Sequence, residues 1–223
     1  MHGSDSQKSI LLAGGGGHAL VVMEAAQLAG QRVVGFFDDA PTNSRMNAHV
    51  SWLGRLDEID QFRLNPPSKT SAVHLAIGSI SLRDDLIKAI SVEYVSITHP
   101  TAIISAASQI GVGSFIGPGT VVNANASIGA HAIINSRAVV EHDCRIDTNV
   151  HIAPGAVLGG GVCVGSNTLV GVNATVKPNV EIGANCVVGA GAVVVADVCD
   201  GQVVAGVPAR PISSIGLRLR KSA

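Results

Sequence analysis

An uninterrupted six-residue period runs through the C-terminal half of the chain. From about residue 100, every sixth position is aliphatic, and glycine often follows it directly. The residue two places earlier is small or of modest size, as at Ala126, Ala132 and Ala138. A fixed short period of this kind is typical of a parallel β-helix. The aliphatic positions are Ile104, Ile110, Ile116, Val122, Ile128, Ile134, Val140, Ile146, Ile152, Leu158, Val164, Val170, Val176, Ile182, Val188 and Val194.

The period has a direct physical reading. Three hexads form one triangular coil, and the aliphatic residue points into the prism and stacks on its counterpart in the next coil. The residue two places earlier also points inward, near a corner, and must therefore be small. Glycine or asparagine relaxes the backbone at the turn, and successive coils should lie ~4.8 Å apart. An all-β sandwich would instead alternate with period two and break at irregular turns.

The N-terminal segment has a different pattern, in which strands and helices alternate. SILLAG, RVVGFFDD and AVHLAIG have the composition of strands, and EYVSI is a candidate fourth strand. HALVVMEAAQLAG and LRDDLIKAI have helical spacing. The prediction is a small parallel α/β domain at residues 8–98, a Rossmann-like half, followed by the β-helix at 99–212. MHGSDSQ carries no apolar core, and we interpret it as a tail or a cloning remnant.

Composition excludes several classes of partner. Aromatic residues make up only 3% of the chain, so aliphatic side chains must fill the core, as a repeat architecture allows. The formal net charge is -1 and the basic residues are scattered, which argues against a nucleic-acid partner. No apolar stretch is long enough to span a membrane, and no signal peptide is visible. Two of the four cysteines, Cys144 and Cys186, fall on small inward positions, so we expect free thiols in a cytoplasmic protein.

Four motifs together resemble one branch of the left-handed β-helix acyltransferase superfamily. They are GGGGHA after the first strand, FFDD after the second, VVEHDC within the hexads and the closing AGVPARP. That branch holds the sialic acid O-acetyltransferases and the N-acetyltransferases of nucleotide-linked 4-amino-4,6-dideoxy sugars, such as the bacillosamine and perosamine enzymes. The resemblance covers roughly residues 8–212. It implies a left-handed β-helix, acetyl-CoA as donor, and a homotrimer with active sites in the grooves between neighbours.

The glycine-rich loop has two readings. Gly14, Gly16 and Ala19 spell G-x-G-x-x-A between a strand and a helix, which by itself indicates an NAD site. The α/β segment supplies only one mononucleotide-binding half, however, and no domain for hydride chemistry follows. We therefore expect backbone N–H groups at the helix start to hold the phosphates of a nucleotide-sugar. The alternative is that the glycines only permit a tight turn.

Three side chains near this loop are candidate ligands of the nucleotide-sugar. Asp38 and Asp39 end the second strand, from where either could accept hydrogen bonds from the base or the ribose. The resemblance implies binding roles for these two residues and for His18. His18 could instead be a surface residue of the first helical turn, and Asp39 could simply begin a loop.

His142 is the strongest candidate for catalysis. It follows the inward Val140 by two residues, so it should leave the coil near a corner and face outward. Its neighbour Asp143 can hold the imidazole in one tautomer and raise its basicity. Gly160 lies one full coil later and should stack directly above, ~5 Å away, with its amide unshielded in the run 159–161.

The resemblance adds roles for these and two further residues. It implies a catalytic histidine at His142 with Asp143 as its acidic partner. Asn135 and His151 match positions that help to hold acetyl-CoA or the acceptor amine, although a turn residue and a polar groove wall are the alternatives. No pair of histidines has convincing metal-ligand spacing, so no metal is expected.

These features predict an N-acetyltransferase that moves acetyl from acetyl-CoA to the 4-amino group of a UDP- or GDP-linked 4-amino-4,6-dideoxy sugar in glycan or O-antigen biosynthesis. His142 would act as general base, and the Gly160 amide would stabilise the oxyanion. One alternative is an O-acetyltransferase of sialic acid or a related sugar, because the motifs do not separate amine from hydroxyl acceptors. Another is a non-catalytic β-helix binding module, against which the His142–Asp143 pair argues.

Overall fold

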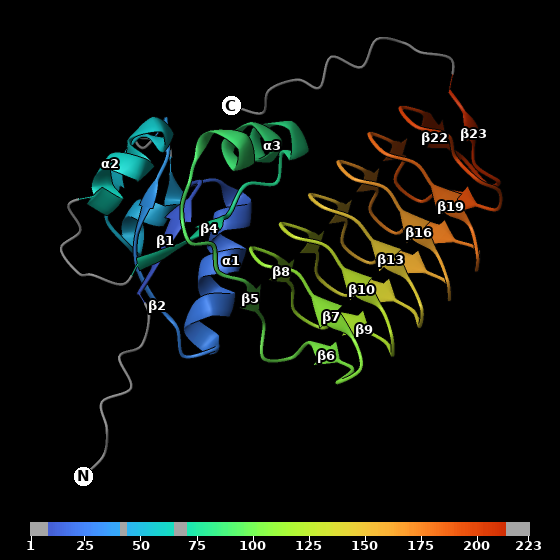
Figure 1. Ribbon diagram of the computed structural model, residues 1–223, viewed down its shortest axis with the longest axis horizontal. Helices are drawn as coiled ribbons and strands as arrows, with labels where there is room; N and C mark the ends of the chain where they lie inside the picture. Colours follow the sequence, from blue (N-terminus) through green and yellow to red (C-terminus); the bar gives the residue numbers. More distant parts are fainter. Residues whose placement is uncertain (1–8, 41–43, 65–70, 213–223) are drawn as a thin grey trace.

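The computed structural model describes residues 9–40, 44–64 and 71–212, so the segment MHGSDSQ lies outside the described residues. Figure 1 shows two parts, an N-terminal α/β domain and a long prism of stacked coils. No helix among the described residues is long and apolar enough to cross a membrane.

The N-terminal domain contains a four-stranded parallel sheet in the order β3-β2-β1-β4. Its strands are β1 (Ser9–Ala13), β2 (Arg32–Phe37), β3 (Trp52–Gly54) and β4 (Ser71–Leu75). The helices are α1 (Gly17–Leu28), α2 (Ile59–Leu64) and α3 (Ile80–Ala89), with short 3-10 helices at Arg45–Ala48 and Leu56–Glu58. The first helix ends as expected, because Gly30 adopts φ 75° just beyond it.

EYVSI, the candidate fourth strand, contacts this sheet beside β4 but does not form a strand of it. Tyr94 makes only an isolated bridge to Val73, and Ile97 begins β5 (Ile97–Thr98), which pairs with β8 in the prism. The fourth strand is instead β3, an edge strand whose three residues were too short a run to recognise. The segment before the prism is therefore shared between the two domains.

The prism consists of three parallel sheets. We call them the domain-side sheet (β5, β8, β11, β14, β17, β20, β22 and the antiparallel β23), the aliphatic sheet (β6, β9, β12, β15, β18, β21) and the polar sheet (β7, β10, β13, β16, β19). The remaining bounds are β6 (Ile103–Ile104), β7 (Gln109–Ile110), β8 (Phe115–Ile116), β9 (Val121–Val122), β10 (Ser127–Ile128), β11 (Ile133–Ile134), β12 (Val139–Val140), β13 (Arg145–Ile146), β14 (His151–Ile152), β15 (Val157–Leu158), β16 (Cys163–Val164), β17 (Leu169–Val170), β18 (Thr175–Val176), β19 (Glu181–Ile182), β20 (Val187–Val188), β21 (Val193–Val194), β22 (Val203–Ala205) and β23 (Arg210–Pro211).

The register between coils confirms the repeat prediction. Val140 of β12 pairs with Val122 of the coil before and Leu158 of the coil after. The inward aliphatic residues and the small residues near the corners form one continuous core, in which Ile104 and Ile110 of the first coil are only partly buried. Cys144 and Cys186 lie fully inside it as free thiols.

The role expected for glycine at the turns needs correction. The glycine that directly follows an inward aliphatic residue does not have positive φ; a Cβ on Gly111 would instead lie 2.5 Å from the Ala130 nitrogen of the next coil. Glycine is used there because two backbones approach closely. The left-handed conformation occurs two residues later, for example at Asn125 and Asp143.

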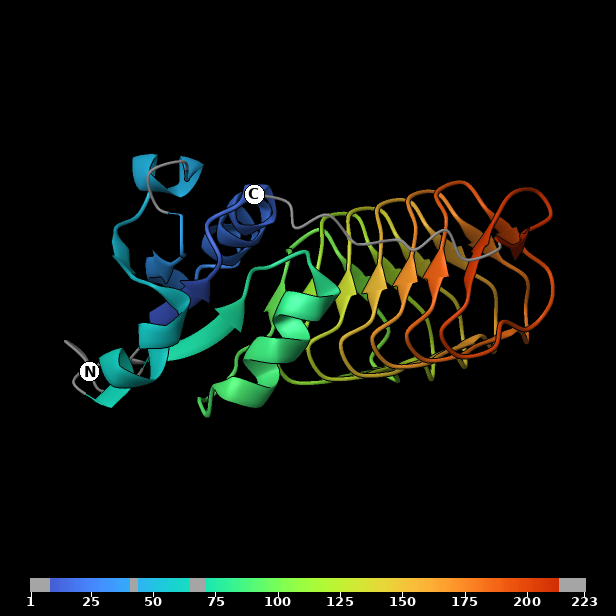
Figure 2. The same cartoon turned by 90° about the horizontal axis from the view of Figure 1, so that it is seen from above.

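A buried arginine joins α3 to the prism, against which this helix lies in Figure 2. Arg83 is 1% exposed, and its Nε donates to Asn149 Oδ1 at 2.8 Å. Its other nitrogens donate to the carbonyl oxygens of Ile77, Gly78 and Asn149 at 2.8 to 3.3 Å. Burial lowers the pKa of the guanidinium to about 10, which still leaves it charged at neutral pH.

Histidines surround Phe115 at the same junction. His74 is 1% exposed, and its ring lies 6.3 Å from that of Phe115, measured between centroids. Its Nδ1 is 2.9 Å from the Val95 carbonyl oxygen, whereas its Nε2 is buried without a partner among the described residues. Burial lowers the pKa of His74 to about 4 and that of His18 to about 3, so both rings are neutral in the folded protein.

These neutral histidines predict a loss of stability in mild acid. The unfolded chain binds protons at these rings below pH 6.5, whereas the folded chain does so only near pH 4. The contribution of these neutral rings to the free energy of unfolding is therefore fully present above pH 6.5 and is lost as the pH falls towards 4. For His74 alone the loss is about 2 kcal/mol at pH 5. Urea unfolding between pH 8 and pH 5 measures this loss, and His74→Phe should make the dependence shallower. Equal unfolding free energies at both pH values would contradict the prediction.

Candidate active site

One corner of the prism presents an exposed histidine that is held by its neighbour. The turn between β12 and β13 carries His142 and Asp143, whose side chains are 63% and 57% exposed. His142 Nδ1 lies 2.8 Å from Asp143 Oδ2. A carboxylate can only accept here, so Nδ1 carries the proton, and in the neutral ring Nε2 is left as the proton acceptor. The hydrogen bond to Asp143 raises the pKa of His142, and the same bond lowers the pKa of Asp143.

The adjacent coils complete this corner. A Cβ on Gly160 would lie 2.6 Å from both Cε1 and Nε2 of His142, so only glycine leaves room for the ring in this position. The His142 carbonyl accepts from the Gly161 amide at 2.9 Å, which fixes the stacking. The Gly160 amide has no acceptor among the residues that the structure describes. The ring and a free N–H therefore lie side by side at the open corner.

The sequence analysis missed three polar residues here. Asn125 Nδ2 donates to Asp143 Oδ1 at 3.2 Å, and Asn123 Nδ2 donates to Glu141 Oε2 at 2.9 Å. The same Glu141 oxygen accepts from the His142 amide at 3.3 Å. Each asparagine lies one coil before its partner. The coil arithmetic that singled out Gly160 would have found both had it been applied in the other direction.

Asn135 and His151 form a second group at the edge of the domain-side sheet. Asn135 Nδ2 lies 3.2 Å from His151 Nε2, and Asn135 Oδ1 accepts from the Ser136 amide at 2.8 Å. A hydrogen bond to the backbone of Gly78 partly offsets the effect of burial on the pKa of His151, and the Gly78 carbonyl also accepts from Arg83 at 3.1 Å. Burial lowers the pKa of His151 to about 4, so the ring is neutral and Asn135 donates to it.

His18 belongs to this second group. Its ring centroid lies 6.5 Å from that of His151 and 5.3 Å, edge-on, from that of Phe115. Its Nε2 is buried and has no hydrogen-bond partner among the described residues. His18 is therefore packed at the domain junction rather than lying free on the surface of α1.

The glycine-rich loop is close-packed at its start and open at its end. Gly14 has φ 112°, and a Cβ there would lie 2.8 Å from the Ala76 carbonyl oxygen. At Gly16 and Gly17, where α1 begins, nothing lies within 4 Å of an added Cβ. The open end therefore leaves space for a ligand at the helix N-terminus, where unpaired N–H groups favour an anion.

The two aspartates after β2 already make backbone contacts. Asp38 Oδ2 accepts from the Gly15 amide at 2.6 Å, and Oδ1 accepts from the Ala40 amide at 2.8 Å. Asp39 Oδ1 instead accepts from the Leu56 amide at 3.2 Å and lies 3.7 Å from Arg55 Nη2. Asp38 thus holds the glycine-rich loop, whereas Asp39 holds the segment that follows β3.

The two groups of candidate residues, at His142 and at Asn135, lie on different corners of the prism. Asn135 precedes β12 and His142 follows it, so the full width of the aliphatic sheet separates them.

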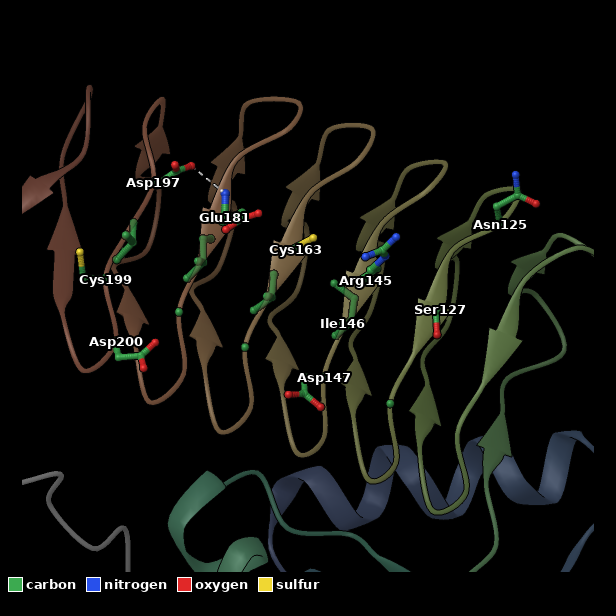
Figure 3. A pocket seen from close by; sticks show the side chains of 16 residues that line it. Asn125, Ser127, Arg145, Ile146, Asp147, Cys163, Glu181, Asp197, Cys199 and Asp200 are labelled. Carbon is green, nitrogen blue, oxygen red and sulfur yellow. Dashed lines mark hydrogen bonds between the residues drawn. The ribbon is translucent and has the colours of Figure 1, made fainter.

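Beyond the His142 corner, the polar sheet carries an open hollow of about 780 Å³ that begins at Asn125 (Figure 3). Its floor includes Arg145 and Cys163, and its far end is acidic, with Glu181, Asp197 and Asp200.

Two family models match the chain. The PglD N-terminal domain matches residues 9–90, and the bacterial transferase hexapeptide model (six repeats) matches 125–160 and 161–196. No curated protein sequence matches the chain.

Solved structures match nearly its whole length. A histidine variant of perosamine N-acetyltransferase from Caulobacter crescentus, in complex with CoA and GDP-perosamine, is 36% identical with a TM-score of 0.85, covering 92% of this chain and 97% of its own. The acetyltransferase domain of PglB from Neisseria gonorrhoeae, in complex with acetyl coenzyme A, is 31% identical with a TM-score of 0.84, covering 93% and 100%. WeeI from Acinetobacter baumannii is 29% identical with a TM-score of 0.81, covering 91% and 99%.

The two-part architecture, the hexapeptide coils and these matches lead to one assignment. The chain belongs to the left-handed β-helix, hexapeptide-repeat family of nucleotide-sugar acetyltransferases that includes perosamine N-acetyltransferase and the PglB acetyltransferase domain.

Proposed function

We propose that the protein transfers acetyl from acetyl-CoA to the 4-amino group of a nucleotide-linked 4-amino-4,6-dideoxy sugar. The observation that carries this proposal is the exposed His142, held by Asp143, with its Nε2 beside Gly160, whose amide has no acceptor in the described ranges. A non-catalytic binding module would have no use for this arrangement. The acceptor is an amine because the relatives whose reaction is named are N-acetyltransferases.

The mechanism is direct attack with general-base assistance. The amine nitrogen attacks the thioester carbonyl carbon while His142 Nε2 removes its proton. The Gly160 N–H donates to the oxyanion as it forms. The carbon–sulfur bond then breaks, and the CoA thiolate takes the proton from the imidazolium.

No acyl-enzyme is needed. Cys144 is the nearest cysteine to His142 in the sequence, but it points into the core, where its thiol donates to the Gly159 carbonyl at 3.2 Å. Burial raises the pKa of this thiol, which disfavours the thiolate that a nucleophile requires. Acetyl therefore passes in one step from CoA to the amine.

The donor runs along the prism from the His142 corner towards the closing segment. The Ala209 amide donates to the Val193 carbonyl at 2.8 Å, so AGVPARP covers the last coil beside the aliphatic sheet. The order β12-β15-β18-β21 separates this end from His142 by three coils, or ~14 Å at ~4.8 Å per coil. That span is comparable with an extended pantetheine arm. The acidic end of the polar-sheet hollow would repel the donor's phosphates.

The acceptor's diphosphate lies at the open end of the glycine-rich loop, over Gly16 and Gly17. The sugar then extends towards His18, whose Nε2 has no hydrogen-bond partner within the described part of the chain, and towards Asn135, which His151 orients. Because burial keeps both histidines neutral, His18 can hydrogen-bond to the sugar and His151 can orient Asn135 without either ring competing as a base. The nucleotide is UDP or GDP.

A homotrimer would bring the two separated groups together. The outward residues of the aliphatic sheet are almost all apolar: Ile103, Val121, Val139, Val157, Thr175 and Val193. Ile103 is 67% exposed and Val157 is 36% exposed. We infer that neighbouring copies cover this face and that each groove joins the His142 corner of one copy to the Asn135–His151 group of the next. The free thiols are consistent with a cytoplasmic location.

Sedimentation equilibrium tests the assembly. A trimer should give three times the 22.6 kDa chain mass. Val157→Glu, which places a charge on the aliphatic sheet, should produce monomers with little activity, whereas Ser127→Glu on the polar sheet should not. A wild-type enzyme that is active as a single chain would refute the shared site.

Removal of the base should lower the rate strongly. His142→Ala and His142→Asn should reduce kcat by about 10²–10⁴-fold, the usual contribution of a general base, with little change in CoA affinity. The wild-type rate should rise with pH through a midpoint above 6.5, because Asp143 raises the pKa of His142 and only the neutral ring accepts a proton. At high pH the amine reaches the site neutral, so the deficit should shrink there.

Kinetics from pH 6 to 9 measure this, with CoA titration as the control. A His142→Ala enzyme within threefold of wild type throughout would refute the general base, and no CoA binding at millimolar concentration would refute the whole assignment.

Gly160→Ala tests the same corner with the imidazole retained. Its Cβ would displace the ring, so kcat should fall while the fold persists.

The two aspartates offer a matched pair for the acceptor site. Asp38→Ala removes the acceptor that holds the Gly15 amide, so it should raise KM for the nucleotide-sugar about tenfold or more and leave KM for acetyl-CoA unchanged. Asp39 contacts Arg55 and Leu56 instead, so Asp39→Ala should have a much smaller effect on this KM. Trp52, the only tryptophan, donates to the Asp38 carbonyl at 3.1 Å and is 42% exposed, so we expect its fluorescence to change when the nucleotide binds. Equal effects of Asp38→Ala on both substrates would contradict separate sites.

A further inference from the structure

Three side chains from two successive coils form one hydrogen-bond network. Asn125 Nδ2 donates to Asp143 Oδ1 at 3.2 Å, and Asp143 Oδ2 accepts from His142 Nδ1 at 2.8 Å. Each carboxylate oxygen thus has its own donor. Asn125 itself lies at the rim of the polar-sheet hollow in Figure 3, one coil away from the ring of His142.

The backbone fixes the positions of Asn125 and Asp143 in this network. Asn125 and Asp143 both adopt the left-handed conformation, with φ 59° and 60°. The Asp143 amide donates to the Ala124 carbonyl at 3.0 Å, and Ser127 pairs with Arg145 just beyond. The Asn125 amide group is therefore held under the Asp143 carboxylate by the same register that stacks the coils.

We propose that Asn125 is a positioning residue, which fixes the Asp143 carboxylate and through it the orientation of the His142 imidazole. This inference rests on the proposed function of His142 as general base. Asn125 does not touch the reacting atoms; it acts only through Asp143.

The electrostatic surroundings make the effect measurable. The charged groups near the His142 ring are Asp143 and Glu141 of its own turn. The coils on either side contribute the uncharged Ala124 and Gly160 at the corresponding position. Asp143 is more than half exposed, so without the asparagine its carboxylate can turn towards water and its bond to the imidazole weakens.

The left-handed turn supplies a matched control. Asn179 occupies the same corner three coils after Asn125, with φ 60°. Glycine suits this conformation at both positions, so Asn125→Gly and Asn179→Gly change the backbone alike, but only the first removes the donor to Asp143. Asn125→Asp keeps the shape and replaces the donor with a second carboxylate.

Two readouts separate positioning from a purely structural role. Proton NMR titration of the His142 ring, assigned by its loss in His142→Asn, should show the midpoint falling by about half a pH unit in Asn125→Gly. The midpoint should rise in Asn125→Asp, because negative charge is added, and should not move in Asn179→Gly. In kinetics, Asn125→Gly should lower kcat about three- to tenfold with both KM values unchanged.

An unchanged His142 midpoint in Asn125→Gly, or an equal shift in Asn179→Gly, would overturn the proposal. The titration needs no substrate and therefore does not depend on turnover. If the midpoints shift as expected but wild-type protein transfers no acetyl group, the positioning role stands and the proposed function fails.

Discussion

The hydrogen-bonded register between successive coils is the constraint on which the active corner depends. Each strand pairs with strands one coil before and one coil after, so side chains that are far apart in sequence are stacked with little freedom to shift. This places Asn125 under Asp143 and Gly160 over His142. An exposed turn would ordinarily hold such groups loosely, but here the backbone fixes three layers of it. Preorganisation at this corner is therefore a by-product of the repeat that builds the core.

That dependence explains why much of the prism was predictable from the sequence. The six-residue period determines which side chains point inward, and counting one coil forward led from His142 to Gly160. Counting backward would have led to Asn125 and Asn123 as well. The error concerned the turn itself: the glycine after an inward residue serves close backbone contact, and the left-handed position, which Asp143 occupies, lies two residues later. Period alone does not distinguish these two reasons for a small residue.

The domain junction could not be predicted in the same way. His18, Arg83 and His151 become neighbours only when the α/β domain docks on the domain-side sheet, and no repeat relates their positions. EYVSI could be no more than a candidate strand for the same reason, because its apolar residues serve both domains. Asp38 and Asp39 look equivalent in the sequence, yet one contacts the glycine-rich loop and the other contacts Arg55. Such differences depend on tertiary contacts that composition and spacing do not encode.

The opposite environments of the histidines divide the chemistry between the two groups. His142 is exposed beside a carboxylate, which raises its pKa and suits a group that must accept a proton. His18 and His151 are half-buried near Arg83, and the loss of solvent around their rings lowers their pKa values and keeps them neutral, so they can serve only as hydrogen-bonding groups. If all three rings could titrate near neutral pH, an acceptor amine would have several competing partners for its proton. With the basic ring on one corner and the neutral rings on another, His142 is the only one of the three rings that can accept a proton near neutral pH.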